Sequence, residues 1–515
     1  MIRACFYKLQ STSEYPQQPP FDPPEIFPEF RKVAILNSVM DKTNTIYPAV
    51  RELLIRLKLD LVNQGTPKWN PLRDFVKENG NVLVKPNLVT DRHPHGNKAI
   101  FWTISHPSII RVLIDYARLA VGPSGRIIIG DTPVENCDFA RLCETSGLQK
   151  MIDDLRERQY ENLELQDFRT FQTNQYPDST VEKTKLPGDP RGYSDINLGK
   201  SSLFQELEDL SGKQNYYTLG DHSVDHINPK TRKVGLPNKY HFSGSHIYKI
   251  PNSILESDFV INLAKLKTHK FAGVTLCLKN AIGICAGKEF LPHRRPGTPA
   301  EGGDSFSGYP SLRYVGWLWF KRVVYRAMGN KAAGRFISLV RKVLPPKLPH
   351  EIYTEPLYGD WHGNDTIWRT ILDLNLVLFH ADRNGLDLNQ RKRTYLGVID
   401  GIIGMDHEAP MAGLPVQSNL LIAGRDPVAI DILGTYMMGF ASQKIPTITG
   451  VNAKQCIALG DVELTEEQVI GNTSLREAKC KFVPAKGWAE LLENSPEHLI
   501  EHKTEDRVLQ VEKPL

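Results

Sequence analysis

The sequence predicts an α/β fold, a mainly parallel sheet with helices on both faces, plus a polar insertion and a basic helical insertion. Short apolar runs alternate with segments of helical periodicity between residues 32 and 439, which is typical of βαβ units. Most apolar runs end in Lys, Asp, Asn or His, as the strands of a ligand-binding sheet edge do. A length of 515 residues with 41% hydrophobic and 24% charged residues excludes a disordered or coiled-coil chain.

The chain is expected to begin with a flexible, proline-rich arm, residues 1–30. Six prolines lie between residues 13 and 28, which favours a polyproline-like segment over packed core. The N-terminus has neither the apolar run nor the cleavage site of a secretory signal. Mean hydropathy is −0.33, and no apolar stretch approaches the length of a membrane-spanning helix. We therefore expect a cytoplasmic protein.

Residues 31–160 are predicted to form the first α/β half. The strands expected there are 32–37, 81–85 and 126–131. One helix is expected over 47–63, where leucines recur at helical spacing. A second helix should open at Ser105-His106-Pro107, because proline suits a first helical turn. A further helix should reach about residue 157.

Two insertions are expected to interrupt the rest of the fold. Residues 161–245 are rich in Asn, Asp, Gly and Pro and are interpreted as a polar, partly irregular insertion. The α/β core resumes in 246–310, and 311–350 form the basic helical insertion. The C-terminal α/β part spans 351–515. Further elements are predicted as strands at 258–262, 395–399 and 419–422 and as helices at 274–284, 364–380 and 427–439.

The net charge of +4 is unevenly distributed along the chain. Residues 311–350 contain nine Lys and Arg, several aromatic residues and no Asp or Glu, so the other 475 residues carry −5. Basic, aromatic helices can lie on an anionic membrane or bind a protein partner. The same segment could equally be a lid over a cleft, with its aromatic side chains turned inward. Nucleic acid is a less suitable partner, because no recognised binding motif accompanies the basic residues.

Polar residues at the ends of the predicted strands point to a ligand-binding edge. Lys85 and Asn87 follow one apolar strand, and Asp131 ends another. A lysine in a buried strand needs a partner or a ligand, because burying an unpaired charge is unfavourable. Arg425-Asp426-Pro427 follows a further strand and is expected at the same edge. Asp131 and Asp426 have a second interpretation, since either could cap the helix that follows it.

Residues 262–283 contain the richest cluster of polar residues. Its lysines are interleaved with apolar residues rather than with glutamates, which favours a cleft over a solvated surface. Lysines close to a helix N-terminus attract a carboxylate or a phosphate. His269 is the natural proton carrier near neutral pH. The candidate catalytic residues are His269, Lys267 and Asp131. The candidate substrate-binding residues are Lys85, Asn87, Lys265, Thr275, Lys279 and Asn280.

Histidine and carboxylate side chains elsewhere could hold a divalent metal. The candidate ligands are His362, Asp400 and Asp406, a donor set that suits Mg, Mn or Fe. Their spacing matches no named metal motif, so the cofactor stays unassigned. The seven cysteines are scattered and form no C-x-x-C pair, which predicts reduced thiols and no cysteine-ligated iron–sulfur cluster.

Several short blocks between about residues 80 and 440 resemble the domain-of-unknown-function 362 proteins. The blocks are Val84 to Leu88, His106-Pro107, Gly130 to Pro133, Asp258 to His269, Gly273 to Thr275, Leu278 to Asn280, Trp361 to Arg369, Val398 to Gly401, and Asp426 to Ala429 with Asp431. Their common order along the chain makes the resemblance specific.

The resemblance implies a cytoplasmic α/β protein of a family often suspected to be enzymes. Some members carry a ferredoxin-like module with two cysteine-ligated iron–sulfur clusters, and no such module is present in this sequence. The family has no generally established reaction, so no residue roles are carried over from it.

Three functions are compatible with the sequence. The first is an enzyme that holds an anionic small molecule, a carboxylate or phosphate, at the C-terminal edge of the sheet and transfers a proton, as an isomerase, epimerase or lyase does. The second is a redox enzyme that uses a bound metal, an exogenous cofactor or a cluster. The third is a membrane-surface or partner-binding protein that acts through residues 311–350.

Overall fold

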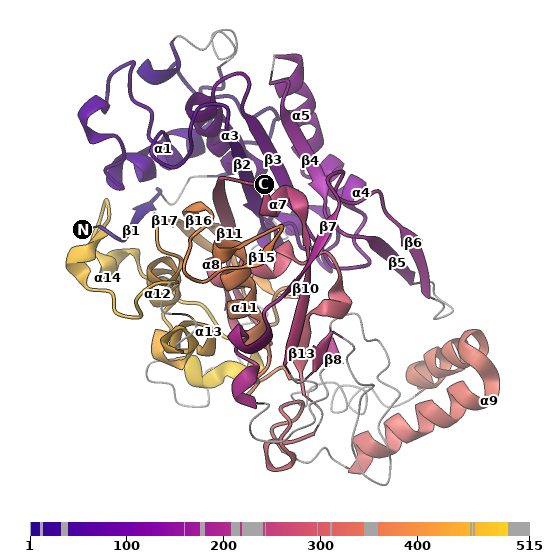
Figure 1. The fold of residues 1–515 in the computed structure, drawn as a ribbon. Coiled ribbons are helices and arrows are strands. Elements are labelled where there is room, and N and C mark those ends of the chain that lie inside the picture. The colour runs from indigo at the N-terminus through magenta and orange to yellow at the C-terminus, as the bar shows by residue number, and fades with distance from the viewer. Residues whose placement is uncertain are drawn as a thin grey trace.

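The structure is a computed structural model that describes residues 2–10, 14–31, 40–158, 160–175, 181–207, 217–218, 240–242, 244–295, 297–308, 312–343, 359–453, 456 and 459–492. At its centre is a nine-stranded sheet with the order β18-β1-β17-β16-β11-β2-β3-β4, to which β12 adds beside β11 (Figure 1). These strands are β1 (Ala4–Lys8), β2 (Asn81–Pro86), β3 (Arg126–Asp131), β4 (Leu163–Asp167), β11 (Phe259–His269), β12 (Gly273–Thr275), β16 (Thr394–Asp406), β17 (Leu414–Gly424) and β18 (Val469–Ile470).

Five neighbouring strands, β16, β11, β2, β3 and β4, run parallel to one another. β17 runs antiparallel to both β16 and β1. The carboxyl ends of the parallel strands therefore share one edge of the sheet, whereas the loop after β17 lies at the opposite edge. This corrects the expectation that Arg425-Asp426-Pro427 joins the other strand ends.

Helices cover both faces of the sheet, which confirms the predicted α/β fold. On one face α1 (Ile46–Arg56), α3 (Pro107–Val121) and α5 (Leu148–Glu157) pack on Val82 and Val84. On the other face α8 (Cys277–Asn280), α11 (Ile367–His380) and α12 (Pro427–Met438) share a core with Leu83. The alternation of side chains along β2 thus divides the interior into two apolar layers.

The remaining elements are short and lie around this body. The helices are α2 (Ile100–Thr103), α4 (Phe139–Thr145), α7 (Asn252–Leu255), α13 (Pro446–Thr449) and α14 (Leu475–Ala478). The strands are β5 (Phe171–Gln175), β6 (Val181–Lys185), β7 (Tyr193–Asn197), β8 (Tyr217–Thr218), β9 (His241–Phe242), β10 (Ser245–Pro251), β13 (Pro292–Arg294), β14 (Ala381–Asp382) and β15 (Gly385–Leu386).

Two helices begin where local sequence signals place them. His106 caps α3, since its Nδ1 accepts a hydrogen bond from the Ser108 amide, and Pro107 fills the first turn. Asp426 caps α12 by accepting from the amides of Val428 and Ala429. The capping interpretation of Asp426 is therefore confirmed.

The N-terminal segment, expected to be a flexible arm, is part of the body. β1 pairs with β17 and β18 inside the central sheet. Aromatic residues beside the prolines, including Tyr15, Phe21 and Phe27, are buried in the core. These aromatic side chains anchor the segment, and proline content alone does not reveal that packing. The strand predicted at 32–37 lies outside the described residues.

The predicted polar insertion, residues 161–245, begins with a strand of the central sheet, because β4 pairs in parallel with β3. The hairpin of β5 and β6 and a small sheet of β7, β10 and β9 follow it. Most residues between 208 and 239 lie outside the described part of the chain. The helix expected over 274–284 is also different, since β12 folds back antiparallel on the end of β11 before the short α8 begins.

The basic segment forms α9 (Leu312–Val343), which lies at the lower right of Figure 1, away from the central sheet. Gly329 has φ 71° and ψ 164°, so the helix breaks there into two arms. Within the described residues, no helix is long and apolar enough to cross a membrane.

Candidate anion-binding site

A cavity of about 180 Å³ lies beyond the carboxyl ends of β2, β3 and β11. Its lining includes seven of the residues predicted for catalysis or substrate binding, which are Asn87, Asp131, Lys267, His269, Thr275, Lys279 and Asn280. Lys288 and His293 also line it. A cavity therefore lies at the predicted edge of the sheet, and several lysines are among the polar residues that line it.

A buried ion pair between Lys85 and Asp131 lies beside the cavity, and Asp131 is the partner that lines it. Lys85 Nζ lies 2.8 Å from Asp131 Oδ1, and both side chains are almost fully buried. Asp131 also accepts from the amides of Leu88 and Thr132, which fixes the carboxylate. A methyl group on Gly283 would lie 2.1 Å from Asp131 Oδ1, so glycine is required for this close approach. Asp131 thus acts as the fixed counter-charge of Lys85.

Lys267 reaches the cavity from the end of β11 without a carboxylate partner in the described structure. Its ammonium donates to Asn87 Oδ1 and to the Thr103 carbonyl, both at 2.7 Å. Burial, reinforced by the positive charge of Lys279, holds the pKa of Lys267 well below its usual range. An anion in the cavity would relieve both effects.

A chain of amide side chains positions the polar wall. Asn87 Nδ2 donates to Asn280 Oδ1 at 2.7 Å, and Asn280 Nδ2 donates to Asn262 Oδ1 at the same distance. Asn262 in turn donates to the Cys277 carbonyl. These contacts tie the ends of β2 and β11 to α8 and orient the Asn87 oxygen toward Lys267.

Three further lysines line the cavity, and one of them, Lys270, is paired with Asp360 at 3.1 Å. Lys279, on α8, makes no hydrogen bond or ion pair with any described residue. Burial, together with the charges of Lys288 and Lys85, lowers the pKa of Lys279 to about 7. Lys288 donates to the carbonyl and the hydroxyl of Thr132, and burial also lowers its pKa. The cavity thus gathers Lys267, Lys279 and Lys288 beside a Lys85–Asp131 pair that is already neutral.

The two histidines of the cavity differ in their hydrogen bonding. His269 Nδ1 accepts from the amides of Phe271 and Ala272, so the ring proton of the neutral form lies on Nε2. His293 Nδ1 lies 2.9 Å from the Leu291 carbonyl and must donate to it, which leaves Nε2 as an acceptor. Burial lowers the pKa of His269 well below its usual range and that of His293 to about 3. His269 therefore offers a donor to the cavity, and His293 offers an acceptor.

Thr275 adds a hydroxyl that has no partner within the described structure. The side chain is 3% exposed, and its Oγ1 makes no hydrogen bond although it is buried. Buried hydroxyl groups are rarely left unbonded, because the lost hydration costs about 1–3 kcal/mol. Since Thr275 lines the cavity, a ligand there is the natural partner of this hydroxyl.

Lys265 was also predicted to bind substrate, but the structure places it elsewhere. Its ammonium lies 3.0 Å from Asp400 Oδ2 and donates to the Tyr15 hydroxyl. Tyr15 donates to Asp400 Oδ1 at 2.5 Å and stacks on His106. Lys265 does not line the cavity, and its charge is already balanced. It is therefore a structural residue that joins β11, β16 and the N-terminal segment.

The three predicted metal ligands do not meet. Asp400 is paired with Lys265, and Asp406 Oδ1 lies 2.6 Å from His407 Nδ1. His362 is exposed and lies 3.4 Å from Glu490. No group of three His, Cys, Asp or Glu residues with metal-binding geometry occurs in the described ranges. In the described structure, His362, Asp400 and Asp406 each have a different protein neighbour and are not brought together as one set.

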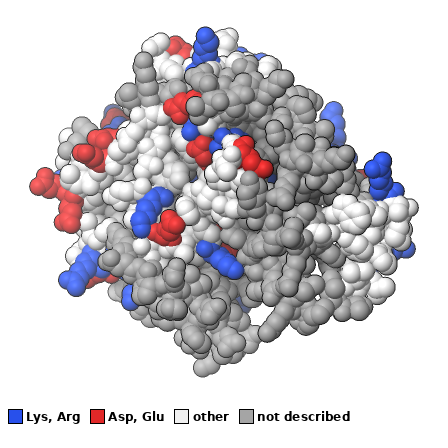
Figure 2. Space-filling view, turned by 90° about the horizontal axis from the view of Figure 1, so that it is seen from below, with Lys and Arg blue, Asp and Glu red and all other residues white. Residues whose placement is uncertain are grey.

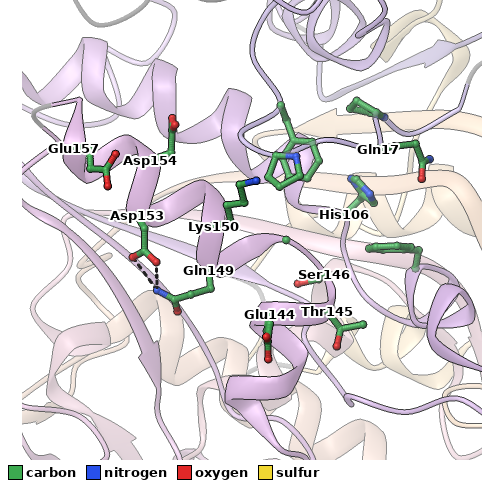
Figure 3. A pocket seen from close by; sticks show the side chains of 15 residues that line it. Gln17, His106, Glu144, Thr145, Ser146, Gln149, Lys150, Asp153, Asp154 and Glu157 are labelled. Carbon is green, nitrogen blue, oxygen red and sulfur yellow. Dashed lines mark hydrogen bonds between the residues drawn. The ribbon is translucent and has the colours of Figure 1, made fainter.

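A larger cavity of about 670 Å³ lies between the N-terminal segment and α4 and α5 (Figure 3). Asp153, Asp154 and Glu157 lie along one side of it, and Glu144 lies at another. Among the lining residues that the structure describes, Lys150 alone is a Lys or Arg. This mainly acidic lining does not suit an anion, so volume alone does not identify the site.

Lys288 and His293 are among the lining residues that the sequence did not indicate. Lys288 continues the lysine-rich stretch after α8, and this continuation is the one signal that could have included it in the predicted cleft. His293 lies on β13, in a part of 246–310 where no local pattern indicates a ligand-binding residue.

A comparison with protein families finds one match, a family described as "Domain of unknown function (DUF362)", over residues 214–436. This match confirms the resemblance over a segment that is less than half of the chain. It covers β11, β12, α8 and the lysine-rich stretch, whereas Lys85 and Asp131 precede it. No curated protein matches the chain. No solved structure matches it either.

Proposed function

We propose that the protein is an enzyme that binds an anionic small molecule, through its carboxylate or phosphate group, in the lysine-rich cavity and transfers a proton on it. The observation that carries this proposal is the presence of Lys267, Lys279 and Lys288 around one cavity without a carboxylate partner in the described structure. Buried charges of one sign repel each other and lose hydration, so the protonated lysines are stabilised when a counter-charge binds between them.

The other lining groups suit the same class of ligand. The Thr275 hydroxyl and the His269 Nε2–H can both donate to oxygen atoms of a bound anion. A cavity of about 180 Å³ limits the ligand to a small molecule or to the anionic end of a larger one. The wall of Asn87 and Asn280 is fixed by hydrogen bonds, so little ordering is needed on binding.

Lys279 is the best proton carrier in the cavity. Its pKa of about 7 lets it lose and regain a proton at neutral pH, which a general acid or base needs. His269 serves better as a neutral donor that stabilises negative charge, because its Nδ1 is occupied by two amides. Proton transfer next to a held carboxylate or phosphate is the chemistry of isomerases, epimerases and lyases. The seven cysteines are free thiols, which favours a cytoplasmic setting for this reaction.

Titration calorimetry with inorganic phosphate and with malonate tests the binding step. Lys267→Met and Lys279→Met keep much of the side-chain volume and remove the charge, and each should weaken binding by about tenfold or more. Lys68→Met is the matched control, since Lys68 is exposed and does not line the cavity. Unchanged affinity in both cavity variants, with normal folding, would exclude this cavity as the anion site.

Hydrogen exchange tests the chemical step. The protein is incubated in D₂O with a panel of carboxylated and phosphorylated metabolites, and mass spectrometry records deuterium on carbon. With wild-type protein, at least one compound should incorporate deuterium at carbon. The Lys279→Met variant should give no incorporation, whereas the Lys68→Met control should give as much as wild type. Anion binding without any labelling would leave a binding protein and refute the enzymatic part.

A further inference from the structure

The two arms of α9 carry large apolar side chains on their outer surface. Trp319 and Val323 are exposed on the first arm, and Phe336 and Leu339 are exposed on the second. Within each arm these residues are three or four positions apart, so they share one side of the helix. We call these four residues, with the exposed Arg326 and Arg335, the α9 surface.

Among the exposed apolar residues, Phe336 also takes part in the contact between the two arms, through Phe320, whereas no described contact of Trp319, Val323 or Leu339 does. Val324, Ala333 and Ile337 are buried and form a small apolar cluster of their own, with Phe320 packed against it. Phe320 and Phe336 approach each other across the bend at Gly329. The arms thus have one inner apolar side for each other and a second apolar side that faces solvent.

The charge of the segment complements an anionic lipid bilayer. Residues 311–350 carry nine positive charges and no acidic residue, while the other residues carry −5 in total. In Figure 2 the lobe at the right, formed by α9, shows white and blue side chains, whereas basic and acidic side chains lie near one another elsewhere on the described surface. Exposed tryptophan and leucine beside arginine are the composition of helices that lie in the membrane interface.

We propose that the α9 surface binds the protein peripherally to anionic membranes, with Trp319, Val323, Phe336 and Leu339 inserted among the lipids and the basic residues at the headgroups. This function is separate from the lysine-rich cavity, because no described residue of α9 lines the cavity. The site acts at the surface of the bilayer, since α9 is not apolar enough to cross it.

Vesicle flotation with the full-length protein tests the proposal. Vesicles of phosphatidylcholine are compared with vesicles of phosphatidylcholine and phosphatidylserine at low ionic strength. The protein should float only with the anionic vesicles, and high salt should release it, because exposed charges are screened within about 10 Å at 0.1 M salt. Equal flotation with both vesicles, or none with either, would overturn the proposal.

Two double variants separate the apolar and the electrostatic contributions. Trp319→Ala with Leu339→Ala should reduce the bound fraction severalfold, because less apolar surface enters the bilayer. Arg326→Gln with Arg335→Gln should weaken binding by about 25-fold, at about fivefold for each charge. Both pairs are exposed, so circular dichroism should show unchanged folding.

The matched control replaces exposed residues elsewhere. Val62→Ala with Lys68→Gln removes one apolar side chain and one charge from a single exposed stretch of the body. This control should float as wild type does. If it loses binding as the α9 variants do, the attraction comes from general surface charge and the assignment to α9 is wrong. If nucleic acid rather than vesicles is bound in an α9-dependent manner, the proposal fails in favour of that partner.

Discussion

Lys279 should make the unliganded protein less stable, because its charge is partly buried and has no described partner. Its folded pKa of about 7 is below the unfolded value, so the unfolded chain binds more protons between about pH 7 and pH 10.5. The loss of stability caused by the buried Lys279 charge is therefore fully present below pH 7 and disappears as the pH rises toward 10.5. Lys279→Met should raise the free energy of unfolding by about 1–3 kcal/mol near pH 6 and by less near pH 10. Urea unfolding at both pH values measures this.

The affinity for anions should change with pH in the opposite direction to the stability, again because of Lys279. A bound phosphate or carboxylate favours the protonated ammonium, so wild-type affinity should fall as the pH rises through about 7. Phosphate itself titrates in this range, so malonate is the better probe. Lys279→Met should remove this pH step and leave a flat profile in calorimetric titrations between about pH 6 and pH 8. A step of the same size in the variant would assign the titration to another group.

Gly283 is the residue at which a single methyl group should disturb the site. Its Cβ would lie 2.1 Å from Asp131 Oδ1 and 2.6 Å from Lys85 Nζ, closer than any real contact. Gly283→Ala should therefore destabilise the protein by about 1–3 kcal/mol and weaken malonate binding. Gly308→Ala is the control, because no atom lies within 4 Å of its added Cβ. Thermal unfolding and calorimetry together measure both effects, and equal behaviour of the two variants would refute the close packing.

At the scale of elements, the N-terminal segment should contribute to stability through Tyr15. Its hydroxyl bridges Lys265 on β11 and Asp400 on β16, and burial raises the pKa of this phenol well above its usual range. Tyr15→Phe keeps the stacking on His106 and removes only the bridge. The free energy of unfolding should fall by about 1–3 kcal/mol, since the remaining buried pair loses a hydrogen-bond partner.

Tyr7→Phe provides the matched control on β1, because no hydrogen bond of the Tyr7 hydroxyl is described and the ring is only partly buried. Urea unfolding should show a change within about 0.5 kcal/mol for Tyr7→Phe. If Tyr15→Phe changes the free energy of unfolding as little as Tyr7→Phe does, the hydrogen bonds of the Tyr15 hydroxyl do not contribute to stability.

The contrast between Lys265 and Lys267 explains how far the sequence could predict the site. Both lie on β11 among apolar residues, and both were expected to bind substrate. Lys265 stands opposite Asp400 of β16, so the neighbouring strand neutralises it. Lys267 follows a shift in the same ladder and pairs with Thr275 of β12, beside the cavity. The register of β11 against β16 and β12 decides which of the two lysines reaches the cavity. This register cannot be predicted from a single sequence.

At the scale of the whole molecule, the alternation of apolar strands and helices predicted the layered sheet correctly, because burial on both faces leaves a strong local pattern. The direction of each strand was harder to predict from the sequence. The antiparallel course of β17 and the insertion of β1 beside it depend on contacts between the two ends of the chain. These contacts also explain why a proline-rich start, which is locally typical of a flexible arm, belongs to the core.

The uneven charge of the molecule leads to a last prediction, that the cavity and the α9 surface act independently. Lys279→Met should weaken malonate binding without changing flotation on phosphatidylserine vesicles. Trp319→Ala with Leu339→Ala should reduce flotation without changing the malonate dissociation constant, because the buried residues of α9 cluster among themselves. A lid would behave differently, since its aromatic side chains would cover the ligand and their removal would weaken malonate binding. Calorimetry and flotation on the same four proteins, with wild type and Lys68→Met as references, decide between a membrane-binding element and a lid.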